Sequence, residues 1–187
     1  RGDKTLSVTK DGKTVYLHSK YNPLREAEAI VNEYKEVKEG TTVIFYGTGL
    51  GYHIDLFLKK HPKINYYIYE PIPELLYTYI THKSVKELPS KNLKNIVMGL
   101  SEQETLEFLN RFIDRNRGEV LLVELPNHKQ IFPDEYEKFL EIFTKTVKNK
   151  RTALHTNYAY QKRWIINSMK NFGEVLSTPN IIMGNKG

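Results

Sequence analysis

Apolar and polar residues alternate in two short runs near the start of this chain, and Asp11-Gly12 separates the runs. An Asp-Gly pair favours the positive φ angles of a tight turn. We therefore expect a β-hairpin with strands at Thr5–Thr9 and Thr14–His18. Because a two-stranded ribbon is marginal by itself, this hairpin must pack against the rest of the protein.

Helical and strand patterns alternate after the hairpin. Asn22 and Pro23 suit the start of a helix, and Ser101 with Glu104 forms the signature of a capping box. The run Val43–Tyr46 is apolar throughout, which is typical of a strand buried on both faces. We expect strands at 41–47, 64–71, 94–99, 119–126 and 181–183, and helices at 22–40, 52–62, 73–83, 101–118, 132–151 and 157–173.

Strands that alternate with helices indicate an α/β fold. We expect a Rossmann-like, methyltransferase-like domain whose mainly parallel sheet carries helices on both faces, preceded by the N-terminal β-hairpin. The expected division is a hairpin at residues 1–22 and the α/β domain at residues 23–187. The last residues carry neither a cap nor a polar tail, so we expect a fragment of a longer multidomain protein.

Composition narrows the function classes. The 187 residues are 40% hydrophobic and 27% charged, which is ordinary for a soluble globular protein. Cysteine is absent from the sequence, which excludes disulfides, thiolate zinc sites and a cysteine nucleophile. No apolar run is long enough to span a bilayer, so we expect no membrane partner and a cytoplasmic location.

The net charge of +6 comes from lysines that are dispersed among glutamates, as on a solvated surface. No nucleic-acid-binding motif accompanies the charge, so we expect no nucleic-acid partner. No histidine pair at helical spacing points to a metal site, and no nucleophile elbow or phosphate-binding loop occurs. The sequence therefore indicates no metal ligand and no catalytic residue.

The candidate ligand site is the stretch TVIFYGTGLGYH. Gly47, Gly49 and Gly51 separate an expected strand from an expected helix, where backbone amides commonly meet a phosphate or ribose. Tyr52 and His53 open the helix, and Glu70 ends the next strand, about 20 residues later, where an acid grips a ribose diol. The cofactor-binding hypothesis comprises these six residues, with S-adenosylmethionine or a nucleotide sugar as ligand.

Two residues limit this hypothesis. Tyr52 stands where a nicotinamide-binding loop has its third glycine, so we do not expect a nicotinamide cofactor. The spacing matches the first motif of class I methyltransferases better, but Phe45 stands where that family usually has an acid. The alternative is a glycine turn kept for close packing of helix against strand. Glu124 ends the fourth strand and either lines the crevice beside Glu70 or binds loop amides.

Three stretches form a recognisable set. They are LHSKYNPLREAEAIV (Leu17–Val31), YGTGLGYHIDLFLKK (Tyr46–Lys60) and YYIYEPIPELL (Tyr67–Leu76). Together they resemble the N-terminal domain of the motility accessory factor (Maf) family of bacterial flagellin glycosyltransferases. The matching positions are Ser19, Lys20, Tyr21, Pro23, Gly47, Gly49, Gly51, Tyr52, His53, Glu70 and Pro71.

The resemblance implies an accessory domain beside a catalytic domain of the same chain. By this resemblance, the catalytic domain is expected to transfer a nonulosonic acid, of the pseudaminic or legionaminic type, from a CMP donor to flagellin. The glycine-rich motif that opens this catalytic domain does not occur here, so no catalytic residue carries over. The resemblance makes flagellin the suspected partner. A methyltransferase-like nucleotide-binding enzyme and a non-catalytic α/β interaction module remain the alternatives.

Overall fold

The computed structural model describes residues 3–10, 12–83, 90–116 and 118–152. The helix expected at 157–173 and the strand expected at 181–183 lie outside the described residues. Residues 1–149 form one compact unit, and only this unit is described below. The elements are β1 (Ser7–Lys10), β2 (Lys13–Tyr16), α1 (Pro23–Asn32), β3 (Thr42–Tyr46), α2 (Tyr52–Lys60), β4 (Asn65–Glu70), α3 (Pro73–His82), β5 (Leu93–Met98), α4 (Glu102–Arg115), β6 (Val120–Glu124), α5 (Pro126–Ile131) and α6 (Pro133–Thr152).

The main sheet is parallel, as expected, with strand order β5-β4-β3-β6. Its inner strand β3 is buried along its whole length, and Phe45 pairs with Ile68 on one side and Val123 on the other. The chain adds β4 and β5 to one side of β3 and then returns to add β6 to the other. The carboxyl ends of β3 and β6 therefore flank the topological switch point, where doubly wound sheets commonly bind ligands.

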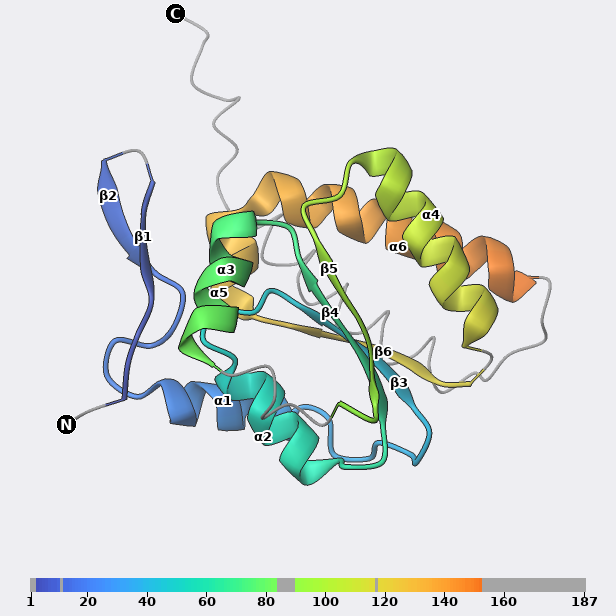
Figure 1. Cartoon of the computed structure of the whole chain (residues 1–187), viewed down its shortest axis with the longest axis horizontal. Helices are drawn as coiled ribbons and strands as arrows, with labels where there is room; N and C mark the ends of the chain where they lie inside the picture. Colours follow the sequence, from blue (N-terminus) through green and yellow to red (C-terminus); the bar gives the residue numbers. More distant parts are fainter. Residues whose placement is uncertain (1–2, 11, 84–89, 117, 153–187) are drawn as a thin grey trace, which may run out of the picture. The chain divides into compact units, whose positions relative to one another are not determined.

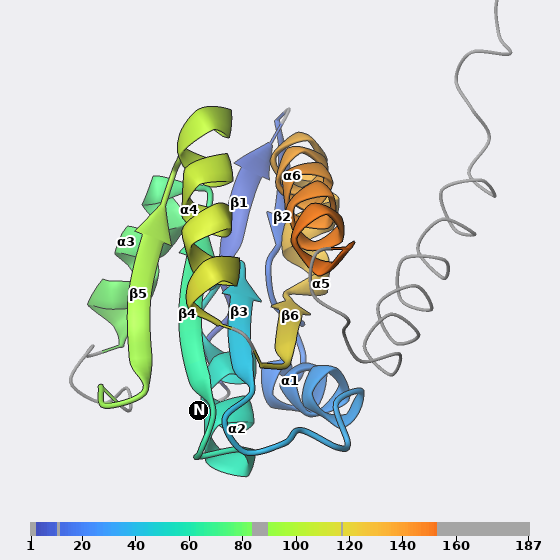
Figure 2. The ribbon, with the colours of Figure 1, turned by 90° about the vertical axis from the view of Figure 1, so that its right-hand side faces the viewer.

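Helices cover both faces of the sheet. Figures 1 and 2 show α4 and α6 on one face and α1, α2 and α3 on the other. Side chains of β3 alternate between these layers, because successive residues of a strand point to opposite faces. Phe45 meets Phe57 of α2 with ring centroids 5.4 Å apart, while Tyr46 meets Phe139 of α6 at 4.8 Å. The expected α/β class, including the N-terminal hairpin, is confirmed.

The hairpin turns at the position predicted from Asp11-Gly12, since Lys10 pairs with Lys13. Its regular strands begin and end one or two residues closer to the turn than the sequence indicated. The pairing continues beyond them, because the Leu17 amide donates to the Leu6 carbonyl at 2.8 Å.

Helix α1 begins as predicted, with the Asn22 side chain accepting from the Arg25 amide at 2.9 Å. It ends at Asn32 instead of continuing to Gly40. Residues 35–40 contain four charged residues and a single large apolar one, Val37, so they offer no apolar face. Tyr34 leaves the helical path, and its hydroxyl donates to the Leu122 carbonyl at 3.0 Å.

The short helix α5 was not predicted, because Leu125 and Pro126 were assigned to the end of the strand expected at 119–126 and six residues are too few to show a helical period. The capping box at the start of α4 is present, with the Ser101 amide donating to the Glu104 carboxylate at 2.9 Å. Among the described residues, no helix has the length and apolar character that a membrane crossing requires.

Candidate functional site

The glycine corner, defined as Gly47–Gly51, joins the end of β3 to the start of α2 as predicted. All three of its glycines have positive φ, and Gly51 precedes the first helical residue Tyr52. The Gly47 amide donates to the Tyr69 carbonyl at 2.9 Å, and the Gly51 amide to the Thr48 carbonyl at 2.9 Å. These bonds close the loop tightly on the tip of the sheet.

Side chains of the protein itself pack directly on the three glycines. A Cβ atom added to Gly49 would lie 2.3 Å from the His18 ring, and one added to Gly47 would lie 2.9 Å from the His128 ring. A Cβ atom on Gly51 would lie 2.4 Å from the Tyr79 ring. The glycines therefore permit other groups to approach the backbone closely. These groups are aromatic rings from the segment between β2 and α1, from α5 and from α3.

Glu70 lies at the end of β4, as predicted, but its carboxylate is fully buried. One oxygen accepts from the Thr48 amide at 2.7 Å and from the Thr48 hydroxyl at 2.9 Å. The other lies 2.7 Å from Nε2 of His128 and accepts from the Ile72 amide at 3.1 Å. Because a carboxylate only accepts hydrogen bonds, this His128 nitrogen carries a proton. Glu70 thus ties the glycine corner to α5 and to the start of α3.

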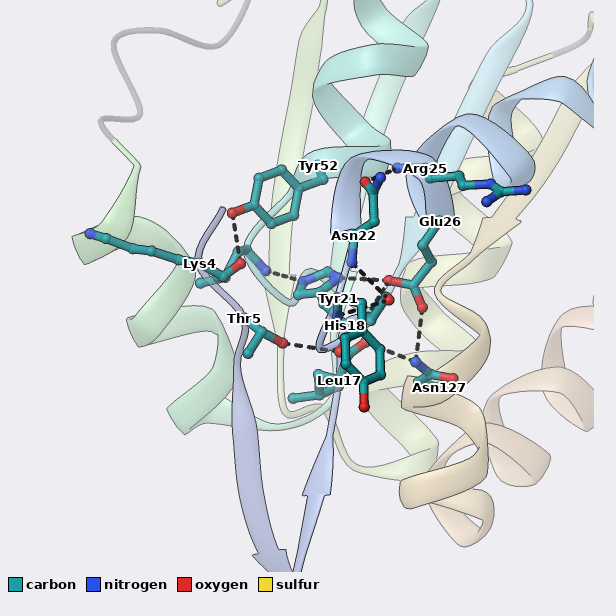
Figure 3. Close-up of polar contacts among 12 residues, drawn as sticks. Lys4, Thr5, Leu17, His18, Tyr21, Asn22, Arg25, Glu26, Tyr52 and Asn127 are labelled. Carbon is teal, nitrogen blue, oxygen red and sulfur yellow. Dashed lines mark hydrogen bonds and ion pairs between the residues drawn. The ribbon is translucent and has the colours of Figure 1, made fainter. Parts of the chain in front are cut away.

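His18 supplies a second internal partner of the glycine corner, and sequence reasoning did not single it out. Its ring is 1% exposed, and Nε2 accepts from the Leu50 amide at 2.7 Å (Figure 3). The neutral ring therefore carries its proton on Nδ1, which lies 3.4 Å from the Glu26 carboxylate. The Tyr52 ring meets the His18 ring edge-on, with centroids 5.3 Å apart.

Glu26 connects this contact to two other elements. Its carboxylate accepts from the Ser19 amide at 3.0 Å and from the Asn127 side chain at 2.9 Å (Figure 3). Asn127 also donates to the Leu17 carbonyl at 3.4 Å. A single carboxylate of α1 therefore holds the segment that leaves the hairpin against α5.

Tyr52 and His53 point in different directions. The Tyr52 hydroxyl donates to the Lys4 carbonyl at 2.8 Å, and partial burial together with the charge of Asp3 raises its pKa. His53 is buried beneath the loop, against the Phe45 ring. Burial lowers the pKa of His53 to about 3, so its ring is neutral at physiological pH.

Glu124 has a different set of partners from Glu70. Its backbone lies opposite Tyr46 in the sheet. Its carboxylate accepts a hydrogen bond from the Tyr136 hydroxyl and lies 3.5 Å from the Lys129 ammonium group. The two strand-end acids therefore contact separate groups. Glu124 faces the start of α6 and Glu70 faces the glycine corner.

Residues from two segments fill the space at the switch point between β3 and β6. Leu17 and His18 come from the hairpin exit, and Leu125 and His128 come from the chain after β6; each is at most 1% exposed. The two loop amides of Thr48 and Leu50 are bonded to Glu70 and His18. The arrangement is thus a buried polar junction that locks the hairpin to the sheet. Cofactor binding by Gly47, Gly49, Gly51, Tyr52, His53 and Glu70 stays a prediction.

Sequence reasoning identified the glycine corner and Glu70 but missed His18, Glu26 and His128. One signal was available for His18, which directly precedes the Ser19-Lys20 stretch used for the resemblance. His128 follows an unrecognised helix start, so nothing local distinguished it.

Comparisons with known proteins agree with these motifs. Residues 3–84 match the family model described as the glycosyltransferase Maf N-terminal domain. A protein of Treponema pallidum (strain Nichols), described as an uncharacterized protein, is 25% identical over 181 residues, covering 93% of this chain and 58% of the relative. The chain therefore spans little more than half the length of that relative.

A similar solved structure is that of the MAf glycosyltransferase from Magnetospirillum magneticum AMB-1. It aligns with 78% of this chain and 32% of its own, with a TM-score of 0.42 and 10% identity. The family match covers β1 to α3, which include the hairpin exit, the glycine corner and Glu70. The resemblance drawn from the sequence is thus confirmed, because residues 3–84 of this chain match the model of the glycosyltransferase Maf N-terminal domain.

Proposed function

We propose that this chain is the accessory N-terminal part of a cytoplasmic Maf-type glycosyltransferase and performs no sugar transfer by itself. The parent protein would transfer a nonulosonic acid of the pseudaminic or legionaminic type to flagellin. Support for the family comes from the match over residues 3–84. Support for an accessory role comes from the buried junction, in which His18 and His128 lie where a Rossmann-like fold would place its ligand.

The single observation that carries the accessory role is the hydrogen bond from the Leu50 amide to Nε2 of His18. This amide belongs to the loop whose backbone would meet a phosphate in a nucleotide-binding protein. A ligand at this point would have to displace a buried ring and its bond to Glu26. Such a displacement leaves buried polar groups unpaired, which costs about 1–3 kcal/mol for each group.

Transfer assays test this proposal. We expect the full-length parent to transfer a CMP-linked nonulosonic acid to flagellin, and residues 1–187 alone to transfer none. Removing residues 1–187 from the parent should lower transfer or flagellin capture. Sugar transfer by the isolated residues 1–187 would overturn the accessory role.

A calorimetric titration tests the methyltransferase-like alternative. We expect no heat when S-adenosylmethionine is added to the 187-residue chain. Micromolar binding that is lost in Glu70→Ala, with folding retained, would favour the nucleotide-binding enzyme instead. A flagellin pulldown separates the accessory role from a general interaction module, because only the former requires capture of flagellin by the parent protein.

A further inference from the structure

A groove of about 670 Å³ lies between the hairpin and α5. Lys10 of the hairpin contacts Ile131 and Phe132 at the end of α5, on the side of the molecule away from β5 (Figure 2). The groove lies outside the buried junction, because its walls are exposed or half-buried apart from Ile131, and only Asn127 also contacts Glu26. The wall residues are Lys10, Lys13, Val15 and Tyr16 from the hairpin, and Asn127, Gln130 and Ile131 from the α5 segment.

The outer edge of β2 borders this groove at Tyr16 and has no strand partner among the described residues. β2 pairs only with β1, and bonded and non-bonded pairs alternate along an antiparallel ladder. The Leu17 amide bonds to the Leu6 carbonyl, so the next pair, Ser7 with Tyr16, is a non-bonded one. The amides and carbonyls of Tyr16 and Thr14 therefore point away from β1, along the edge that an added strand would use.

Positive charge is concentrated at one end of the groove. Lys10 and Lys13 lie directly opposite each other, although like charges across a ladder reduce stability. The Lys10 ammonium group donates to the Ile131 carbonyl and lies over the Phe132 ring at 5.8 Å, which keeps it at the groove wall. None of the described residues that line the groove is acidic. The charge is therefore complementary to a carboxylate-bearing ligand.

The hairpin is held in place before any ligand arrives. The Thr5 hydroxyl donates to the His18 carbonyl at 3.0 Å, and the Tyr52 hydroxyl donates to the Lys4 carbonyl at 2.8 Å (Figure 3). His18 in turn is anchored to the glycine corner. A preformed groove lowers the ordering cost of binding.

We propose that an extended acidic peptide segment of a partner protein adds to the edge of β2 where that edge borders this groove. Main-chain hydrogen bonds to Thr14 and Tyr16 would align the segment, and Lys10 and Lys13 would pair with its carboxylates. Lysines at a strand edge repel a second copy of the same edge, so the charge favours an acidic partner over self-association. This binding goes beyond the proposed function and does not depend on sugar transfer.

Fluorescence polarisation with the 187-residue chain tests the proposal. The probe is a short labelled peptide of alternating threonine and glutamate, compared with its threonine–lysine counterpart and with a version N-methylated on alternate amides. We expect saturable binding of the acidic peptide alone, weakened by salt because exposed charges are screened. N-methylation should weaken it about tenfold or more, since it removes main-chain donors while the protein stays unchanged.

Two proline variants separate the two edges of the hairpin. Thr14→Pro removes an amide on the β2 edge, and Thr9→Pro removes the equivalent amide of its cross-strand partner on the β1 edge. We expect Thr14→Pro and Lys13→Glu each to weaken binding about tenfold and Thr9→Pro to change it less than about twofold.

Three outcomes of the peptide measurements would overturn the proposal. They are equal losses in the two proline variants with their circular dichroism unchanged, equal binding of the lysine peptide, and no saturable binding of the acidic peptide by the wild-type chain. Dimerisation seen in sedimentation and abolished by Thr14→Pro would identify a second copy as the occupant, and would also overturn it.

Discussion

The Nε2 atom of His18 accepts a hydrogen bond from the Leu50 amide at 2.7 Å, and the two residues are 32 positions apart. This contact joins the segment that leaves the hairpin to the loop that follows the central strand. It gives the buried histidine a structural task, namely to satisfy an amide that a ligand would satisfy in a nucleotide-binding relative of the fold.

His18→Ala should destabilise the fold by about 2–4 kcal/mol, because it leaves the Leu50 amide unpaired and opens a cavity against Gly49. The measurement is the free energy of unfolding in urea. His82→Ala is the matched control, since His82 is exposed at the end of α3, and it should change stability by less than about 0.5 kcal/mol. Similar values for the two variants would contradict the task assigned to His18.

Glu70→Gln should cost about 3 kcal/mol or more, as expected when a buried charged partner is removed. Both carboxylate oxygens accept from donors, from Thr48 on one side and from His128 and Ile72 on the other. An amide nitrogen at either position would face a donor, so the glutamine cannot restore the full set of bonds.

Glu74→Gln is the control for Glu70→Gln, because Glu74 is exposed in the first turn of α3. Losing its charge near a helix N-terminus should cost no more than about 1 kcal/mol. If urea unfolding shows the same loss for both glutamines, Glu70 does not act as a buried anchor.

The glycine corner and the position of Glu70 were predictable from sequence because their signals are local. An apolar run, three glycines and a helical pattern follow one another within Thr42–Lys60, and the acid ends a recognisable strand. The direction of the Glu70 side chain was not predictable, because it depends on Thr48 and on His128, which lies 58 residues further along the chain.

The groups that fill the switch point were not predictable for the same reason, because they come from segments that are distant in the sequence. His18 follows a strand of the hairpin, and His128 lies on a helix too short to show a periodic pattern. Each of these two residues, taken locally, resembles a lone surface histidine. Only the packing of the hairpin exit and α5 against the glycine corner reveals what they contact.

Gly49→Ala should destabilise the fold by about 3 kcal/mol, since backbone strain at positive φ adds to a collision with the His18 ring. Gly40→Ala separates these causes, because Gly40 also has positive φ but nothing lies within 4 Å of an added Cβ. It should cost only about 1 kcal/mol.

The double variant His18→Ala/Gly49→Ala completes the test. Removing the ring frees the space that the alanine methyl needs. The stability loss of the double variant should therefore be smaller than the sum of the two single losses by about 1 kcal/mol or more. Additive losses in urea unfolding would show that the ring and the glycine do not pack against each other.

The buried neutral ring of His53 should make stability depend on pH. Because its pKa in the folded protein is lowered to about 3 from the usual 6.5, the unfolded chain binds a proton between these values and the folded chain does not. The free energy of unfolding contributed by His53 is therefore fully present above pH 6.5 and falls as the pH is lowered toward 3. The expected slope is at most about 1.4 kcal/mol per pH unit. His53→Leu lacks this proton, so the stability difference, wild type minus variant, should decrease steadily in urea titrations from pH 7 to pH 5; parallel curves would show that protonation of His53 is not coupled to unfolding.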